Sequence, residues 1–266
     1  KIINKLDSEE QKYYILGKGS NTIFPDGKLD VFIIKISNTL EYLGVSGTEI
    51  KVGAGFGMAK LSKTLSKQGL KGLEFAGGIP ATVGGAIFMN AGAHLSEIGN
   101  VVKSVTVIEN GQLKTYLKNE CDFSYRHSIF QTNKDIIIEA TLELEEGNGV
   151  SEFKKMAGNL EYRKEMQPLE LPSCGSVFRN PEEGHAGKII EECGLKGLVI
   201  GGAQVSEKHA NFIVNNGGAT TKDIIDLIEV IKSTVMKEKN IDLKDVKIAS
   251  ELFNVAVTFH ALNDFE

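Results

Sequence analysis

The stretch from Gly77 to Gly92 constrains the fold more than any other part of the chain. Its sixteen residues read Gly-Gly-Ile-Pro-Ala-Thr-Val-Gly-Gly-Ala-Ile-Phe-Met-Asn-Ala-Gly, with five glycines, one proline and no charged side chain. Because glycine weakens both helices and strands, this composition predicts an irregular loop. Free N–H groups in such a loop form a concavity suited to phosphate. We interpret it as a ligand-binding loop, and the alternative is a glycine-rich turn packed under a helix.

A second glycine-containing loop follows the apolar run 13–16, which we expect to be a strand. It reads Gly17-Lys18-Gly19-Ser20-Asn21 and combines conformational freedom, a positive charge and two hydrogen-bonding side chains. The spacing matches neither the Rossmann fingerprint nor a P-loop. Gly17 and Gly77 lie 60 residues apart. Two such loops predict one long diphosphate ligand held from two sides.

Composition narrows the class of protein. A chain of 266 residues can bury one large core or several smaller ones, and a net charge of −5 argues against general nucleic-acid binding. We find no apolar run long enough to cross a bilayer and no signal-peptide pattern. The three cysteines lack metal-ligand spacing and the histidines form no cluster, so we expect no metal. A reducing cytoplasm is the simplest expectation, with no membrane or nucleic-acid partner.

Periodicity predicts a mixture of helices and strands. Asn110-Gly111 marks a hairpin, Gly147-Asn148-Gly149 marks a domain boundary, and Thr220 with Asp223 resembles a capping box. Apolar runs and alternation predict strands over 31–34, 42–45, 49–52, 101–109, 112–117, 135–144, 198–205 and 211–215. Helical spacing predicts helices at the N-terminus, over 58–68, 151–166 and 185–193, and after Thr220.

The two loops, taken together, resemble the flavin-binding half of the UDP-N-acetylenolpyruvoylglucosamine reductase family. The resemblance continues through Tyr125-Arg126-His127-Ser128, Gly175–Pro181 and Lys208–Phe212, and it covers about residues 13 to 245. Each motif alone is weak, but their combination in this order is specific. The resemblance implies an α+β fold, with a two-lobed FAD-binding domain of the vanillyl-alcohol-oxidase/PCMH type and a C-terminal α+β substrate domain.

The resemblance also implies domain limits. We expect one FAD-binding lobe over 1–35, a second over 36–147 and a substrate domain over 148–250, with 251–266 outside the family pattern. The family carries an earlier strand pair ahead of the position of Lys1, so we expect the first lobe to be N-terminally incomplete. Because residue 168 runs almost directly into Ser176, the chain resembles the shorter branch, which lacks a tyrosine loop.

The implied activity is reduction of UDP-N-acetylglucosamine enolpyruvate to UDP-N-acetylmuramate in peptidoglycan precursor synthesis. NADPH would reduce a non-covalently bound FAD, and the substrate would then take hydride at its terminal methylene carbon and a proton at the neighbouring carbon. The flavin carries the redox chemistry and the protein positions it. The partner is a UDP-sugar, and a monomer is the simplest oligomeric state.

The cofactor-binding residues are carried over from the two loops. We expect an added Cβ at Gly78 or Gly84 to obstruct the ligand more than the fold. The full set is Gly17, Lys18, Gly19, Ser20, Asn21, Gly77, Gly78, Ile79, Pro80, Thr82, Val83, Gly84, Gly85, Asn90 and Gly92.

Three residues carry the implied catalysis. Taken singly, Arg126 is a surface arginine and Ser176 a turn serine. By resemblance, Arg126 supports the enol carboxylate and the developing enolate, a task suited to a rigid fork of donors. Ser176 would donate the proton to carbon, and no Gly-x-Ser-x-Gly motif marks it as a hydrolase nucleophile. The family's third group is a glutamate; Asp245 stands in its place here, and Glu251 is the alternative.

Five residues beside these motifs are expected to bind or orient the substrate, and His209 among them can titrate near neutral pH. They are Tyr125, Arg179, Asn180, His209 and Asn211. Two alternatives stay open at this point. One is another FAD-dependent oxidoreductase of the same superfamily, and the other is a flavin-binding protein with impaired turnover.

Overall fold

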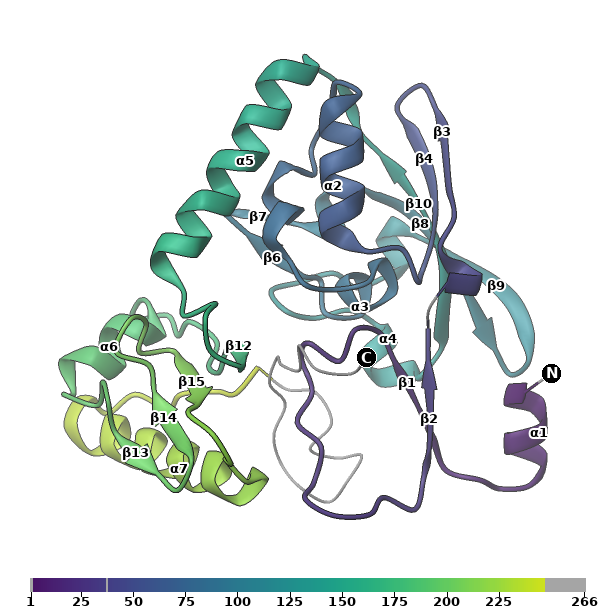
Figure 1. The fold of residues 1–266 in the computed structure, drawn as a ribbon. Coiled ribbons are helices and arrows are strands. Elements are labelled where there is room, and N and C mark those ends of the chain that lie inside the picture. Colours follow the sequence, from purple (N-terminus) through teal and green to yellow (C-terminus); the bar gives the residue numbers. More distant parts are fainter. Residues whose placement is uncertain (1, 37, 247–266) are drawn as a thin grey trace. The chain divides into compact units, whose positions relative to one another are not determined.

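The computed structural model describes residues 2–36 and 38–246. The chain forms two compact units (Figure 1). Among the described residues, the first unit comprises 2–18, 30–36 and 38–163, and the second comprises 19–29 and 164–246. The glycine loop that follows the first strand is therefore divided, with Gly17 and Lys18 in the first unit and Gly19 onward in the second.

The first unit is built on a five-stranded antiparallel sheet whose strand order is β3-β4-β10-β8-β9. Its strands are β3 (Leu43–Ser46), β4 (Glu49–Gly53), β8 (Val102–Glu109), β9 (Gln112–Leu117) and β10 (Ile136–Glu143). The register pairs Val52 with Ala140 and Val105 with Tyr116. Asn110 and Gly111 both have positive φ, as a two-residue type I′ hairpin requires, so the predicted hairpin is confirmed.

Helix α2 (Met58–Lys67) buries Met58, Leu61 and Leu65 completely in the first unit's core. These positions fall at i, i+3 and i+7, one apolar stripe of an amphipathic helix, as the sequence predicted. The exposed lysines lie on the other side, and Gly69, with φ +81°, follows the helix end.

The prediction of an irregular loop between Gly77 and Gly92 is wrong in part. Residues Glu74–Gly78 form the 3₁₀ turn η2, and Val83–Phe88 form helix α3. Thr82 caps α3 by accepting a hydrogen bond from the Gly85 N–H, and Val83, Ala86 and Ile87 are fully buried. Because α3 packs on β4 and β10, tertiary burial outweighs the low helix propensity of its two glycines.

Gly84 shows why a glycine belongs inside this helix. Its N–H donates to the carbonyl of Ala54 at 2.9 Å, and a Cβ placed on it would lie 3.0 Å from the Ala54 Cβ. A side chain at Gly84 would therefore press on the fold itself, and its effect on a ligand stays a prediction. This glycine lets the backbone of α3 approach the residue after β4.

The remaining elements of the first unit are short. Parallel strands β1 (Tyr13–Leu16) and β2 (Phe32–Lys35) pair Tyr13 with Phe32, which confirms both predicted strands. The others are α1 (Ile2–Ser8), η1 (Asn38–Leu40), β5 (Leu70–Lys71), β6 (Gly92–Ala93), β7 (Ser96–Glu97), η3 (Ile98–Asn100), η4 (Lys118–Glu120), α4 (Phe130–Asn133) and β11 (Glu145–Glu146).

Helix α5 (Gly149–Met166) corrects the predicted domain boundary at 147–149. Its residues up to Arg163 belong to the first unit, because Met156 is buried against Gly77 and Asn159 donates to the Glu74 carbonyl at 3.2 Å. Asn148 is a helix cap whose Oδ1 accepts from the Val150 N–H at 2.9 Å. The unit boundary lies at 163/164.

The second unit contains a four-stranded antiparallel sheet in the order β12-β15-β14-β13. Its elements are β12 (Ser173–Ser176), α6 (Ala186–Glu192), β13 (Val199–Ile200), β14 (Ala203–Val205), β15 (Phe212–Asn215) and α7 (Thr221–Lys239). The predicted single strand over 198–205 is wrong, because Gly201, with φ +53°, turns the chain into a hairpin. The capping box of Thr220 and Asp223 at the start of α7 is confirmed.

We predict that Gly84→Ala lowers the free energy of unfolding by about 1–3 kcal/mol, because the new methyl group must displace Ala54. Gly85→Ala is the matched control in the same helix. Its Cβ meets only Thr82 Oγ1, at 3.4 Å, so we expect a change within about 1 kcal/mol. Urea unfolding of the two variants measures this, and equal losses would contradict the packing role of Gly84.

Candidate active site

The first two residues of one predicted loop, Gly17 and Lys18, lie against the glycine-rich segment and the start of α2 in the first unit. A Cβ on Gly17 would lie 2.6 Å from Thr82 Oγ1, so the end of β1 lies against the residue that caps α3. A Cβ built on Gly57, at the start of α2, would lie 3.9 Å from Lys18 Nζ. Gly57 gives α2 no side-chain cap. A lysine beside two helix N-termini makes this region electropositive and suited to an anion.

Several backbone N–H groups inside the glycine-rich segment already have partners within the protein, which removes them from the donors available to phosphate. The N–H of Val83 donates to the Phe56 carbonyl at 2.8 Å, and that of Gly85 donates to Thr82 Oγ1 at 3.2 Å. The Ile79 N–H is also paired, with the Ala76 carbonyl at 3.0 Å. These residues fix the shape of the segment, and any ligand contact from them comes through other atoms.

Arg126 is held in one orientation by the end of the glycine-rich segment. Its Nη2 donates to the Gly92 carbonyl at 2.9 Å, its guanidinium lies 5.1 Å from the Tyr125 ring centroid, and its φ is +57°. No carboxylate pairs with it in the described part of the chain. A guanidinium with five N–H donors therefore keeps donors for an anionic ligand.

Asn90, predicted to bind the cofactor, is used inside the protein. It is fully buried, its Nδ2 donates to the Ser124 carbonyl at 2.8 Å, and its Oδ1 accepts from the Gly99 N–H at 2.9 Å. With its amide engaged on both sides, Asn90 positions the turn that carries Arg126. The structure therefore gives this side chain a positioning role in place of the predicted direct contact with the cofactor.

Gln131 is a positioning residue that the sequence analysis missed. Its Nε2 donates to the Arg126 carbonyl at 3.1 Å and to the Phe88 carbonyl at 2.8 Å. Ser128 donates to the same Phe88 carbonyl at 2.8 Å. Only the spacing of five residues from Arg126 links Gln131 to the motif, and no local pattern marks it.

Asn21 carries the clearest sign of an absent partner. Both polar atoms of its side chain are buried, and within the described residues neither has a hydrogen-bond partner. An unsatisfied buried polar group costs about 1–3 kcal/mol, so such groups are rare unless a ligand or water completes them. The side chain offers one donor group and one acceptor, a set suited to a nucleotide.

Ser176 and Asp245 come from neighbouring segments of the second unit. Ser176 ends β12, is exposed, and follows Gly175, whose φ is +72°. The Val246 N–H donates to the Val177 carbonyl at 2.9 Å, which places Asp245 opposite Phe178. The segment that contains Asp245 therefore runs beside the residues that follow Ser176. Asp245 also pairs with Lys232 at 3.6 Å, whereas Glu251, the alternative, lies outside the described residues.

Asn211, predicted to bind substrate, is also engaged within the protein. Its Oδ1 accepts from the Phe178 N–H at 2.8 Å and its Nδ2 donates to the Phe178 carbonyl at 2.9 Å. The side chain is buried. Its role is therefore to hold the loop after Ser176, which corrects the substrate-binding assignment.

Two further predicted substrate residues have structural partners, and one does not. Asn180 Oδ1 accepts from the Ala186 N–H at 3.1 Å, at the start of α6. His209 Nδ1 accepts from the Asn211 N–H at 3.2 Å, and burial lowers the His209 pKa, so its ring is neutral at pH 7. By contrast, Arg179 Nε is buried and unpartnered among the described residues. Arg179 thus keeps a buried donor for a ligand.

Comparisons with known proteins bear on the family of the chain. Residues 1–115 match the profile of an FAD binding domain, and residues 167–248 match that of the UDP-N-acetylenolpyruvoylglucosamine reductase C-terminal domain. The UDP-N-acetylenolpyruvoylglucosamine reductase of Anoxybacillus flavithermus is 46% identical over 89% of this chain and 78% of its own length. That of Bacillus subtilis is 42% identical over 91% and 80%.

The chain belongs to the UDP-N-acetylenolpyruvoylglucosamine reductase family. The crystal structure of the reductase from Thermus caldophilus has a TM-score of 0.81, 33% identity, and coverage of 93% of this chain and 89% of its own. The predicted family, the α+β fold with an FAD-binding domain, and FAD as cofactor are therefore confirmed. The residues present fit FAD, because the buried unpaired amide of Asn21 and the Lys18 charge both lie in the predicted loop.

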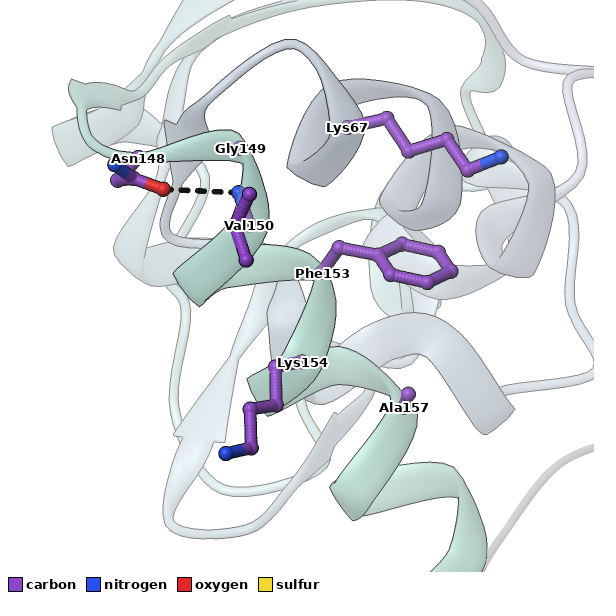
Figure 2. A pocket seen from close by; sticks show the side chains of 7 residues that line it. All are labelled: Lys67, Asn148, Gly149, Val150, Phe153, Lys154 and Ala157. Carbon is purple, nitrogen blue, oxygen red and sulfur yellow. Dashed lines mark hydrogen bonds between the residues drawn. The ribbon is translucent and has the colours of Figure 1, made fainter.

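A hollow of about 630 Å³ in the first unit is lined by none of the predicted site residues. Figure 2 shows it between the end of α2 and the start of α5, with the Phe153 ring at its centre. Lys67 Nζ lies 5.2 Å from that ring, and Asn148 is engaged in capping α5. With no buried unpaired polar group in its lining, this hollow carries no ligand assignment.

Two further findings concern the described residues alone. No helix within 2–36 and 38–246 is both long and apolar enough to cross a membrane. Within the same ranges, no group of three or more His, Cys, Asp or Glu side chains is arranged to hold a metal ion.

We predict that Asn211→Ala lowers the free energy of unfolding by about 2–4 kcal/mol, because both Phe178 backbone groups lose a buried partner. Asn216→Ala is the control: that side chain bonds only to the Gln204 side chain, near the surface, so its loss should cost about 0.5 kcal/mol or less. Urea unfolding of the apo-protein tests both. If the two variants unfold alike, Asn211 does not anchor this loop.

Proposed function

We propose that the chain reduces UDP-N-acetylglucosamine enolpyruvate to UDP-N-acetylmuramate, with NADPH as reductant and FAD bound non-covalently. This places it in peptidoglycan precursor synthesis, in the cytoplasm. The observation that carries the proposal is sequence identity of 40–46% to reductases of this name over about 90% of the chain. We propose that the catalytic residues are Arg126, Ser176 and Asp245.

Each residue's chemistry supports its proposed role. Bound FAD supplies the two-electron transfer from NADPH to the enol double bond. Arg126, fixed by the Gly92 carbonyl and lacking a carboxylate partner in the described residues, suits the substrate carboxylate and the negative charge that develops on it. Ser176, exposed at the end of β12, suits proton delivery to the substrate carbon. Arg179 offers a second cation for the nucleotide, because its Nε is buried and has no hydrogen-bond partner among the described residues.

Asp245 is the one specific reason to keep the alternative of impaired turnover. It stands where the family has a glutamate, and its shorter side chain pairs with Lys232. A carboxylate one methylene shorter reaches less far, and the ion pair with Lys232 holds this one to α7. Turnover of the intact chain distinguishes a working reductase from a flavoprotein that only binds its ligands.

We predict that FAD is released completely from the protein by acid precipitation. Covalent attachment requires a His, Cys or Tyr near the ring, and the segments 17–21 and 77–92 contain none of these. The absorbance at visible wavelengths should therefore appear in the supernatant. Yellow colour that stays in the pellet after washing would contradict non-covalent binding.

We predict that Ser176→Ala separates the two half-reactions. Flavin bleaching by NADPH should stay normal, because it needs only cofactor positioning. Reoxidation by the enolpyruvyl sugar should slow by about 10²–10⁴-fold, the usual contribution of a general acid. Anaerobic stopped-flow absorbance measures both steps. Ser176→Cys should regain part of the rate, since a thiol is a stronger acid than a hydroxyl.

Ser173→Ala is the matched control, because Ser173 lies on the same strand and pairs with Val214. It should show wild-type rates in both steps. Reoxidation of Ser176→Ala at the wild-type rate would make Ser176 a turn residue. Failure of both half-reactions in Ser176→Ala, with the control intact, would mean that the change disrupts binding and would remove the evidence for proton donation.

A further inference from the structure

The chain uses arginine very sparingly. Of its 30 basic residues only three are arginines, namely Arg126, Arg163 and Arg179. In the described part of the chain the ion pairs belong to lysines, apart from one between His127 and Asp122. Lysine thus carries the general surface charge, and arginine is kept for three positions without a carboxylate partner.

Two of the three arginines already have proposed ligand roles. Arg126 faces the substrate chemistry through its fixed guanidinium, and Arg179 has a buried, unpaired Nε. The third, Arg163, has no assigned role. It lies in the last turns of α5, and like Arg179 it has a buried Nε without a hydrogen-bond partner in the described residues.

Arg163 lies against the glycine-rich segment. A Cβ built on Gly78 would meet Arg163 Cδ at 2.8 Å, and Arg163 Nη1 lies 3.6 Å from the same position. Leu160, one turn earlier on α5, is 3.4 Å away. The absence of a side chain at Gly78 therefore leaves room for the arginine at the backbone of the predicted ligand-binding segment.

The partial burial of this cation, with its Nε enclosed, is unfavourable unless something compensates for it. Burial lowers the Arg163 pKa below its usual range, but an arginine stays protonated in a folded protein. Desolvating a charge without a partner is costly, and a volume-matched apolar side chain would be more stable there. Groups that cost stability in this way are typical of sites where a ligand supplies the missing partner.

We propose that Arg163 is a third ligand-binding arginine, which binds the diphosphate of a nucleotide ligand at the Gly77–Gly78 backbone. A planar guanidinium pairs with phosphate oxygens through two parallel hydrogen bonds, a geometry that lysine cannot reproduce. FAD and the UDP-sugar both carry a diphosphate, so either can be the source. The inference rests on the proposed function for the identity of the second ligand.

The test compares Arg163→Gln, Arg163→Met and Arg163→Lys with Lys154→Gln, which removes a charge from an exposed position of the same helix. Titration of the apo-protein with FAD gives one dissociation constant. Titration of the FAD-loaded protein with UDP-N-acetylglucosamine gives the other. We expect Arg163→Gln and Arg163→Met to raise one of these two dissociation constants by about 10- to 100-fold, the usual cost of losing a charged hydrogen bond. Lys154→Gln should leave both unchanged.

Thermal unfolding of the apo-protein separates ligand binding from packing. Removing an unpaired buried cation should leave the midpoint of Arg163→Met equal to or above that of the wild type. If Gln and Met variants do not fold, Arg163→Lys decides, because it keeps the charge but loses the planar fork, and its affinity should fall.

Three results overturn the inference. The first is wild-type affinity for both ligands in Arg163→Gln. The second is wild-type affinity for both in Arg163→Met. The third, should only Arg163→Lys fold, is wild-type affinity in that variant. Failure of the proposed function looks different, since the wild-type protein would then bind FAD but not the UDP-sugar.

Discussion

The close approach between the glycine-rich segment and its neighbours is the constraint on which the first unit depends. The N–H groups of Val83 and Gly84 donate to Phe56 and Ala54, the residues that follow β4. Gly17 comes equally close to Thr82 from the end of β1. A side chain at Gly84 would press on Ala54, and one at Gly17 would press on the Thr82 side chain. One glycine-rich segment therefore joins the sheet to the loop predicted to hold FAD.

The orientation of the proposed catalytic arginine follows from the same segment. The carbonyl of Phe88, the last residue of α3, accepts a hydrogen bond from Gln131, and that of Gly92 accepts one from Arg126. Between these two residues, Asn90 donates a hydrogen bond to the Ser124 carbonyl, in the turn that carries Arg126. The backbone that packs α3 on the sheet thus also places the guanidinium. We infer that the glycine-rich segment cannot change its packing on the sheet without also moving the groups that contact the ligand. This explains why so uncharged and glycine-rich a stretch is needed.

Much of the fold could be predicted from local sequence, because its signals are local. Thr220 and Asp223 identify the start of α7, and Asn110-Gly111 identifies the β8–β9 hairpin. What could not be predicted depends on partners distant in sequence. Helix α3 forms because Ala54 and Phe56 accept its first N–H groups, and the roles of Asn90 and Asn211 are set by Ser124 and Phe178. The role of Arg163 is likewise hidden, because its neighbour Gly78 lies 85 residues earlier.

Substrate-dependent NADPH oxidation by the intact, FAD-loaded chain tests the central claim most directly. The assay follows NADPH absorbance with and without UDP-N-acetylglucosamine enolpyruvate, under anaerobic conditions, and identifies the product by mass spectrometry. Our account predicts that NADPH is consumed beyond one reduction of the flavin only when the enolpyruvyl sugar is present, with an equimolar yield of UDP-N-acetylmuramate. Flavin that NADPH reduces but the sugar cannot reoxidise, with the sugar recovered unchanged, would contradict it.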